Sequence, residues 1–122
     1  MYTNYYDMTK KLAHGETFKG NSVTCKKNTF MDRHGVNHEV YAVYSYATIM
    51  YRRETIVNTG EIVSIKFDNR FYSMTTRKIQ GVILRAGIVP DNFPLIERGP
   101  RGGIHGISVK AEWVYGAGWK VA

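Results

Sequence analysis

The longest hydrophobic pattern in this chain runs from Glu39 to Arg53 and is typical of a β-strand. It is rich in Val, Tyr, Thr and Ile and contains no glycine or proline. A period of two divides it into faces that begin with Val40 and Tyr41, and neither face is plainly polar. Because apolar residues occupy both sides, we expect a strand that is central in a sheet, or covered by a helix on one side and a partner on the other.

Shorter runs on both sides of this segment predict further strands. Asn21 to Phe30 is strand-like, and a polar turn around Gly35 connects it to the next strand as a hairpin. The turn from Asn58 to Glu61 leads into a strand over 62–67. We expect Asp68-Asn69 to form a tight hairpin loop, with a returning strand over 70–73. Near the end of the chain, strands over 107–115 and 119–121 flank the turn 116–118.

One helix is predicted from about residue 75 to residue 87. Thr75 or Thr76 is the expected N-cap and Gly87 the end, with Pro90 shortly beyond. An apolar stripe at helical spacing would lie on the sheet, formed by Ile79, Val82, Ile83 and Ala86. The remaining side chains are expected to face away from that stripe or to flank it, namely Arg77, Lys78, Gln80, Leu84 and Arg85.

The N-terminal residues 1–20 form either an arm or a short helix. Asp7 is a possible cap for a helix from Met8 to His14 that ends at Gly15. The predicted fold class is α+β: a twisted, mainly antiparallel sheet with one helix (about 75–87) packed on a face and a C-terminal hairpin. We expect a single domain over residues 1–122, with a core over 21–87 and a glycine-rich loop and hairpin over 88–122.

Charge is the strongest compositional clue to function. The 122 residues carry a formal net charge of +7, and the sequence pI is about 9.6. Such a surface favours nucleic acid or an acidic protein as partner, although an ordinary basic domain with solvated charged faces is the alternative. Cys25 is the only cysteine, and no apolar run is long enough to cross a membrane. A cytoplasmic protein without a membrane partner is therefore expected.

Basic side chains supply the candidate nucleic-acid or anion-binding residues. The start of the predicted helix offers hydroxyls and backbone amides that suit a phosphate, although simple capping would also explain them. A glycine loop that follows the helix carries two arginines with fork-shaped donors. Together with basic pairs in the strands, the candidates are Thr75, Thr76, Arg77, Lys78, Arg98, Arg101, Lys26, Lys27, Arg52 and Arg53.

Tyrosines in the strands are candidates for base stacking or for a subunit interface. Aromatic rings on a sheet beside basic residues can stack on the bases of a single strand, although tyrosines at alternate strand positions are more often core or subunit-interface residues. From the strand tyrosines, which include Tyr41 and Tyr51, the candidates are Tyr44, Tyr46 and Tyr72.

The sequence offers no catalytic constellation. His34 and His38 lie in a predicted turn without a third metal ligand, and no nucleophile has a recognisable companion histidine. We therefore expect a protein that is not an enzyme, with no catalytic residue, metal or cofactor.

Two segments carry a general likeness to a known class of proteins. The strand Tyr41–Met50 and the run Phe71–Gln80, in a small basic chain, resemble accessory proteins of tailed bacteriophages and mobile elements. The resemblance implies host takeover or evasion of host defence in the host cell cytoplasm. The leading hypothesis is a non-enzymatic protein that binds nucleic acid or a host nucleoprotein complex, as an inhibitor of a CRISPR effector would. The alternatives are a sponge for a phosphate-bearing nucleotide signal and a small virion or assembly protein, and a homo-oligomer is possible.

Overall fold

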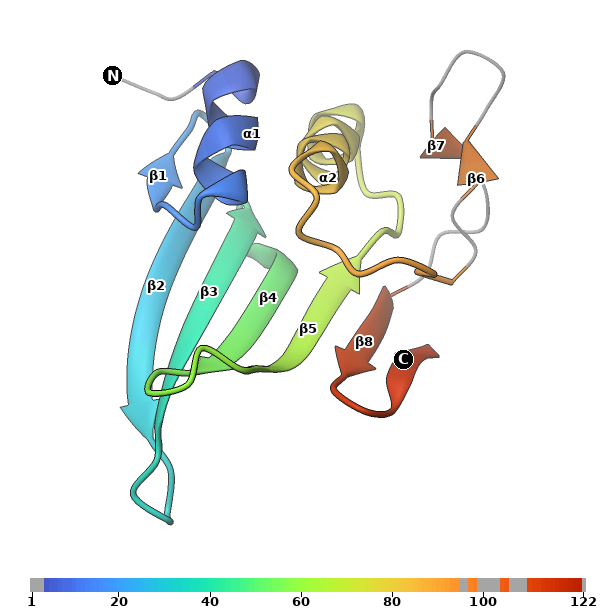
Figure 1. The fold of residues 1–122 in the computed structure, drawn as a ribbon. Coiled ribbons are helices and arrows are strands. Elements are labelled where there is room, and N and C mark those ends of the chain that lie inside the picture. Colours follow the sequence, from blue (N-terminus) through green and yellow to red (C-terminus); the bar gives the residue numbers. More distant parts are fainter. Residues whose placement is uncertain (1–3, 95–96, 99–103, 106–109, 122) are drawn as a thin grey trace.

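The computed structural model describes residues 4–94, 97–98, 104–105 and 110–121 and shows an α+β fold. A seven-stranded antiparallel sheet has the order β1-β2-β3-β4-β5-β8-β9, and two helices lie on one side of it (Figure 1). The strands are β1 (Phe18–Lys19), β2 (Val23–Met31), β3 (Asn37–Ser45), β4 (Thr48–Ile56), β5 (Ile62–Asp68), β8 (Lys110–Val114) and β9 (Gly118–Val121). A separate two-stranded sheet pairs β6 (Glu97–Arg98) with β7 (Ile104–His105) within the long connection after the second helix. The expected α+β class, the helix packed on a face of the sheet and the C-terminal hairpin are confirmed, and the N-terminal segment adds a second helix.

The first helix, α1 (Tyr5–Ala13), resolves the choice between an arm and a short helix. Its N-cap is Asn4, whose side chain accepts a hydrogen bond from the backbone N–H of Asp7, so Asp7 lies within the helix and does not cap it. The apolar side of the helix is anchored by Met8 and Leu12, which are both buried in the core. A helix of this length is marginal alone, so its stability depends on this packing.

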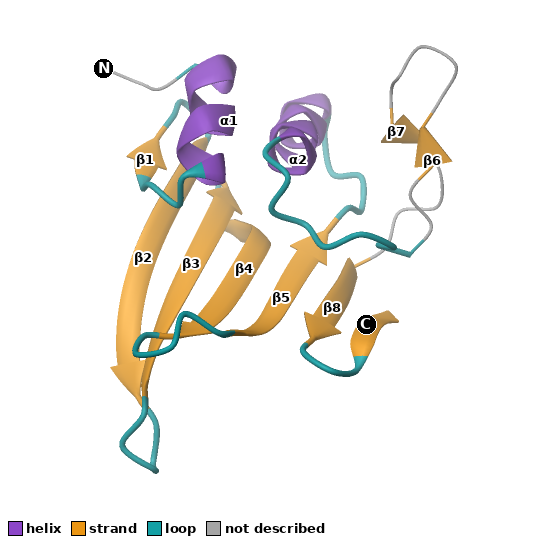
Figure 2. Cartoon of the chain, in the orientation of Figure 1, coloured by secondary structure: helices purple, strands orange, loops and turns teal. Residues whose placement is uncertain are grey.

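The second helix, α2 (Met74–Arg85), carries the predicted apolar stripe and lies beside α1 (Figure 2). Ile79, Val82 and Ile83 are buried in the core as expected. Gln80 was expected to face away from the stripe or to flank it, and its side chain is in fact completely buried. Its amide donates hydrogen bonds to the backbone of the segment before the helix, which is a tertiary contact that helical periodicity does not predict.

The single strand predicted over 39–53 is in fact two strands. β3 and β4 form a hairpin whose tip lies at Tyr46 and Ala47, and Tyr46 has a left-handed backbone (φ 56°). Tyrosine seldom adopts this conformation, so the sequence gives no turn signal. The tip is held by a hydrogen bond of 2.8 Å from the Tyr46 N–H to the Ser22 carbonyl. The cost of the turn is thus offset by contacts from outside the hairpin.

The prediction of a tight hairpin at Asp68-Asn69 is also wrong, because residues 70–73 form no strand. Asp68 ends β5, and its carboxylate accepts hydrogen bonds from the backbone and side chain of Arg70 and from the Tyr72 hydroxyl. These bonds turn the chain locally toward α2. Asx turns of this kind compete with strand pairing, because the carboxylate takes the place of a partner strand's carbonyl.

The N-cap of α2 is Ser73 and not Thr75 or Thr76. The Ser73 side chain accepts a hydrogen bond of 3.2 Å from the Thr76 N–H. We expect Ser73→Ala to lower the free energy of unfolding by about 1 kcal/mol, because an orphan helix N–H loses its acceptor. Urea denaturation would measure the loss, and Thr75→Ala is the matched control. A larger loss for Thr75→Ala than for Ser73→Ala would contradict the assignment.

The core lies between the helices and one face of the sheet. The helix-facing row of cross-strand neighbours is Cys25, Val43, Tyr51, Phe67 and Ala111, all of them buried. The hydroxyl of Tyr51 donates to the carbonyl of Ile88, just after α2, and the ring of Phe93 packs edge-on against Phe67. Side chains alternate along a strand, so the intervening residues of the same strands lie on the opposite face of the sheet. No described helix or strand covers that open face.

Candidate nucleic-acid interface

A row of basic side chains crosses the open face of the sheet. The pairing registers place one residue from each long strand side by side, in the order Lys26, Ala42, Arg52, Lys66, Glu112 and Lys120. Neighbouring strands are about 4.8 Å apart, so the row is about 24 Å long. It brings together four cations from β2, β4, β5 and β9 that lie far apart in the sequence. We refer to Lys26, Arg52, Lys66 and Lys120 as the basic row.

Acidic neighbours neutralise only part of the basic row. The Lys66 Nζ lies 3.5 Å from Glu112 Oε2, and the Arg52 Nη2 lies 3.3 Å from Glu54 Oε1. The Lys66–Glu112 pair is exposed, and exposed ion pairs contribute little and are screened by salt. Lys26 and Lys120 have no ion pair within the described part of the chain and are exposed. The row therefore keeps a positive potential toward solvent.

Of the aromatic residues that were predicted from the sequence, Tyr44 lies on the open face beside the basic row. It is half-buried, and the Lys26 Nζ lies 5.6 Å from the centre of its ring. The structure therefore brings together three of the predicted residues, Lys26, Arg52 and Tyr44, on the open face. Sequence reasoning missed Lys66 and Lys120, because their alignment with Lys26 follows from strand register. The alternation of side chains predicts which residues of one strand share a face with each other. It does not predict which residues of the neighbouring strands lie beside them.

The other halves of the two basic pairs, Lys27 and Arg53, lie on the helix-bearing face. Both contact the buried ring of Tyr41, with the Lys27 Nζ 5.9 Å and the Arg53 guanidinium carbon 4.9 Å from its centre. The Tyr41 hydroxyl donates to the carbonyl of Glu16 in the loop after α1. Arg53 also lines a pocket of about 310 Å³ with Glu39, beside the turn between β4 and β5. Strand alternation thus separates these cations from the basic row.

One end of the open face carries a histidine clamped by two carboxylates. His38 Nε2 lies 2.7 Å from Asp32 Oδ2, His38 Nδ1 lies 3.2 Å from Glu54 Oε2, and the Phe30 ring stacks on the imidazole at 4.9 Å. The hydrogen bond to His38 and the backbone N–H of Val36 lower the pKa of Asp32. The cluster ties the β2–β3 hairpin to β4. Among the described residues, no group of three or more His, Cys, Asp or Glu side chains is arranged to hold a metal ion.

The predicted phosphate site at the start of α2 is mostly occupied by contacts within the protein. The Thr76 hydroxyl is buried and lies 2.8 Å from the Ser45 hydroxyl, while Arg77 donates to the backbone and side chain of Asn69. Thr75 is half-buried, whereas Lys78 is exposed. These residues connect α2 to the end of β3 and to the segment after β5.

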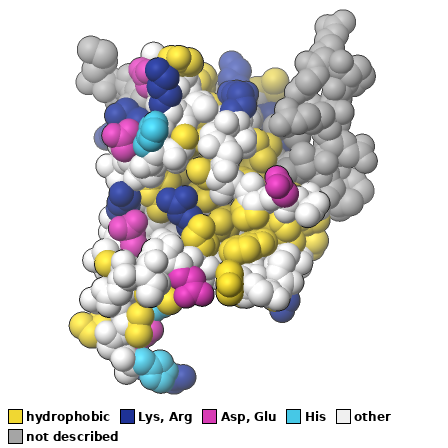
Figure 3. Space-filling model, viewed as in Figure 1, with side chains coloured by type: hydrophobic (Ala, Val, Ile, Leu, Met, Phe, Trp, Pro, Cys, Tyr) yellow, Lys and Arg dark blue, Asp and Glu magenta, His cyan; other side chains and the backbone are white. Residues whose placement is uncertain are grey.

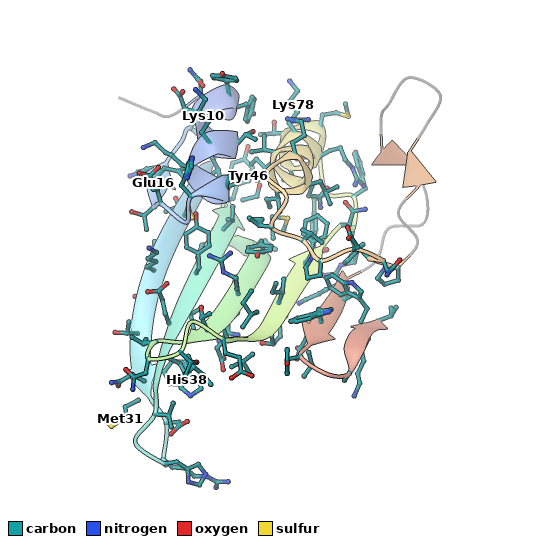
Figure 4. The ribbon with its side chains drawn as sticks, viewed as in Figure 1. Lys10, Glu16, Met31, His38, Tyr46 and Lys78 are labelled. Carbon is teal, nitrogen blue, oxygen red and sulfur yellow. The ribbon has the colours of Figure 1, made fainter. Side chains whose placement is uncertain are left out.

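The remaining candidates are scattered. The Tyr72 hydroxyl bonds to Asp68, and Tyr46 is exposed at the β3–β4 tip near the helices, as Figure 4 shows. Arg98 belongs to β6, but its side chain is outside the described part of the structure, and Arg101 lies outside the described residues.

The helix-bearing side differs in character from the open face. Figure 3 shows hydrophobic side chains gathered below α2, while Lys and Arg side chains are spread over the helices. A groove of about 590 Å³ is lined by Tyr5, Tyr6, Thr9, Lys10 and Arg85. All these side chains are exposed or half-exposed, so this groove is a surface depression and not an enclosed ligand site.

Comparisons with protein-family models, with curated proteins and with solved structures found no match for this chain. In the part that the structure describes, neither helix has the length and apolar character needed to span a membrane.

Proposed function

We propose that this chain is a non-enzymatic protein that binds single-stranded nucleic acid on the open face of its sheet. The observation that carries the proposal is the basic row, which aligns cations from four strands on a face that no described element covers. Phosphate contacts supply most of the affinity of such proteins without sequence preference. A protein of this kind acts stoichiometrically, on free nucleic acid or on a host nucleoprotein complex.

Aromatic rings near the row favour a single strand over a duplex. Tyr44 lies beside Lys26, and Phe30 is 44% exposed at the end of the same face. Unpaired bases can stack on such rings, whereas the bases of a duplex are already stacked. A strand that runs across the sheet would place its phosphates along the basic row and its bases toward Tyr44.

The experiment compares two double variants with equal changes in charge. In one, Lys26→Gln and Lys120→Gln remove the two cations of the basic row that have no ion pair. In the other, Lys10→Gln and Lys78→Gln remove exposed lysines of the two helices, which Figure 4 shows at the opposite end of the molecule from Met31. Binding to a fluorescent single strand is measured by anisotropy over a range of salt concentrations.

We expect the variant of the basic row to reduce the slope of log K against log salt by about 1.4, because each lost phosphate contact on a single strand accounts for about 0.7. The helix variant should retain the slope. Absence of binding at low salt would overturn the proposal. A loss of binding confined to the helix variant would also overturn it. The nucleotide sponge would then be favoured if a mononucleotide raised the melting temperature of the wild-type chain and if the Lys10→Gln change removed that increase.

A further inference from the structure

The outer edge of β2 is open over most of its length. β1 pairs only with the start of β2, opposite Thr24 and Cys25. The remainder, from Lys26 to Met31, has no partner on its outer side among the described strands, and all its residues are exposed. An exposed strand edge is a template for pairing with another chain, and proteins commonly protect it.

The hydrogen bonds of β2 show which residues present their backbone at this edge. The Ser22 carbonyl accepts from Tyr46 at the end of β3, whereas the Val23 carbonyl accepts from Gly20 on the β1 side. Backbone groups alternate in direction along a strand, so those of Lys27, Thr29 and Met31 point outward. These three residues offer an N–H and a carbonyl each.

We propose that this edge pairs antiparallel with the same edge of a second copy, about a twofold axis at Thr29. In this register Thr29 lies opposite Thr29, and Lys27 lies opposite Met31 in both directions. Lys27, Thr29 and Met31 of each copy then exchange backbone hydrogen bonds with their partners in the other copy, which gives about six hydrogen bonds in total. The chain would form a dimer with one continuous sheet.

Charge and space select this register and a second copy as the occupant. Lys26 of one copy lies opposite Asp32 of the other, and the central Thr–Thr pair is a favourable cross-strand pair. A shift of the axis to Asn28 places Met31 opposite Cys25, where β1 already pairs. A shift to Phe30 places Lys27 opposite Arg33, which is a like-charge pair in the hairpin turn. The edge is therefore complementary to itself in one register.

This dimer is independent of the proposed nucleic-acid binding, but it would affect the geometry of the open face. Lys26 belongs to the basic row and lies at the seam, so the rows of both copies would lie on one shared face. Each copy carries a net charge of +7, so the copies repel each other at low salt. Screening at about 0.15 M salt reduces this repulsion to short range, and the oligomeric state should be measured there.

The first test is sedimentation equilibrium over a wide range of protein concentration at this salt. We expect the mass to rise from 13.9 kDa toward twice that value. Met31 is 66% exposed, so Met31→Lys should fold normally while placing two lysine pairs across the seam. It should weaken the dimer roughly tenfold, and Met31→Thr should not. Circular dichroism checks that both variants are folded.

The second test reads the register. Thr29→Cys would place two cysteines about 5.5 Å apart between their Cα atoms, within disulfide range, whereas Asn28→Cys and Phe30→Cys would not face themselves. Mild oxidation should therefore cross-link Thr29→Cys fastest, and Cys25 is buried and does not compete. Faster cross-linking at Asn28 or Phe30 would overturn the register. A chain that stays monomeric at every concentration would overturn the proposed dimer. The open edge would then be a site where an extended peptide of another protein could pair.

Discussion

Replacing Gln80 with leucine is expected to lower the free energy of unfolding by about 2–4 kcal/mol. The side chain is 0% exposed, and its Nε2 donates hydrogen bonds of 2.8 Å to the carbonyls of Asp68 and Arg70. Leucine has a similar size but no donor, so it would leave both carbonyls without that partner in a mostly buried place. Urea denaturation monitored by tryptophan fluorescence would measure the loss.

The matched control is Lys78→Leu, which makes the same kind of change at an exposed position of the same helix. Its effect should stay within about 0.5 kcal/mol. If Gln80→Leu lowered the free energy of unfolding by no more than this control, the two hydrogen bonds would not stabilise the packing of the 69–73 segment against α2.

The second large effect is expected at Asp68, whose side chain is 2% exposed at the end of β5. Burial acts to raise the pKa of this carboxyl, but hydrogen bonds from Arg70 and Tyr72 outweigh burial, and the pKa is lower than its ordinary value. We expect Asp68→Asn to cost about 2–3 kcal/mol at pH 7, because bonds to a charged acceptor are replaced by weaker or mismatched ones.

The pH dependence of this loss has a definite sign. A carboxyl whose pKa is lower in the folded protein stabilises the fold above its unfolded pKa, near 3.8, and this contribution is lost as the pH falls through the folded value. The difference between the wild-type chain and Asp68→Asn should therefore be constant near neutral pH and shrink below about pH 4. Asp91→Asn, which removes one negative charge at an exposed position, is the matched control and should cost little stability at pH 7. A difference that grew in acid would contradict this account.

Local sequence patterns were sufficient to predict the elements that are bounded by glycine turns or helix caps. The strand that became β5, the hairpin of β8 and β9 and the apolar stripe of α2 were predicted, because alternation, glycine turns and helical spacing are visible in short windows. The β3–β4 tip carries no such signal. A tyrosine takes the left-handed conformation there because Ser22 supplies the hydrogen bond that holds the tip.

The candidate site was predicted only in part for a related reason. Lys26, Arg52 and Tyr44 were singled out by their chemistry, and they do lie on one face. Lys27 and Arg53 were singled out on the same grounds, but they lie on the opposite face. Adjacent residues in the regular part of a strand point to opposite sides, so a basic pair there gives only one member to a given face.

The sequence by itself determined the α+β class, the net charge of +7 and the apolar stripe that places α2 on the sheet. Only the tertiary structure decided which charges act together. Lys66 and Lys120 joined Lys26 and Arg52 because antiparallel pairing set residues from four strands side by side. Strand register depends on contacts between distant segments, and a one-residue slip would move each of these side chains to the other face.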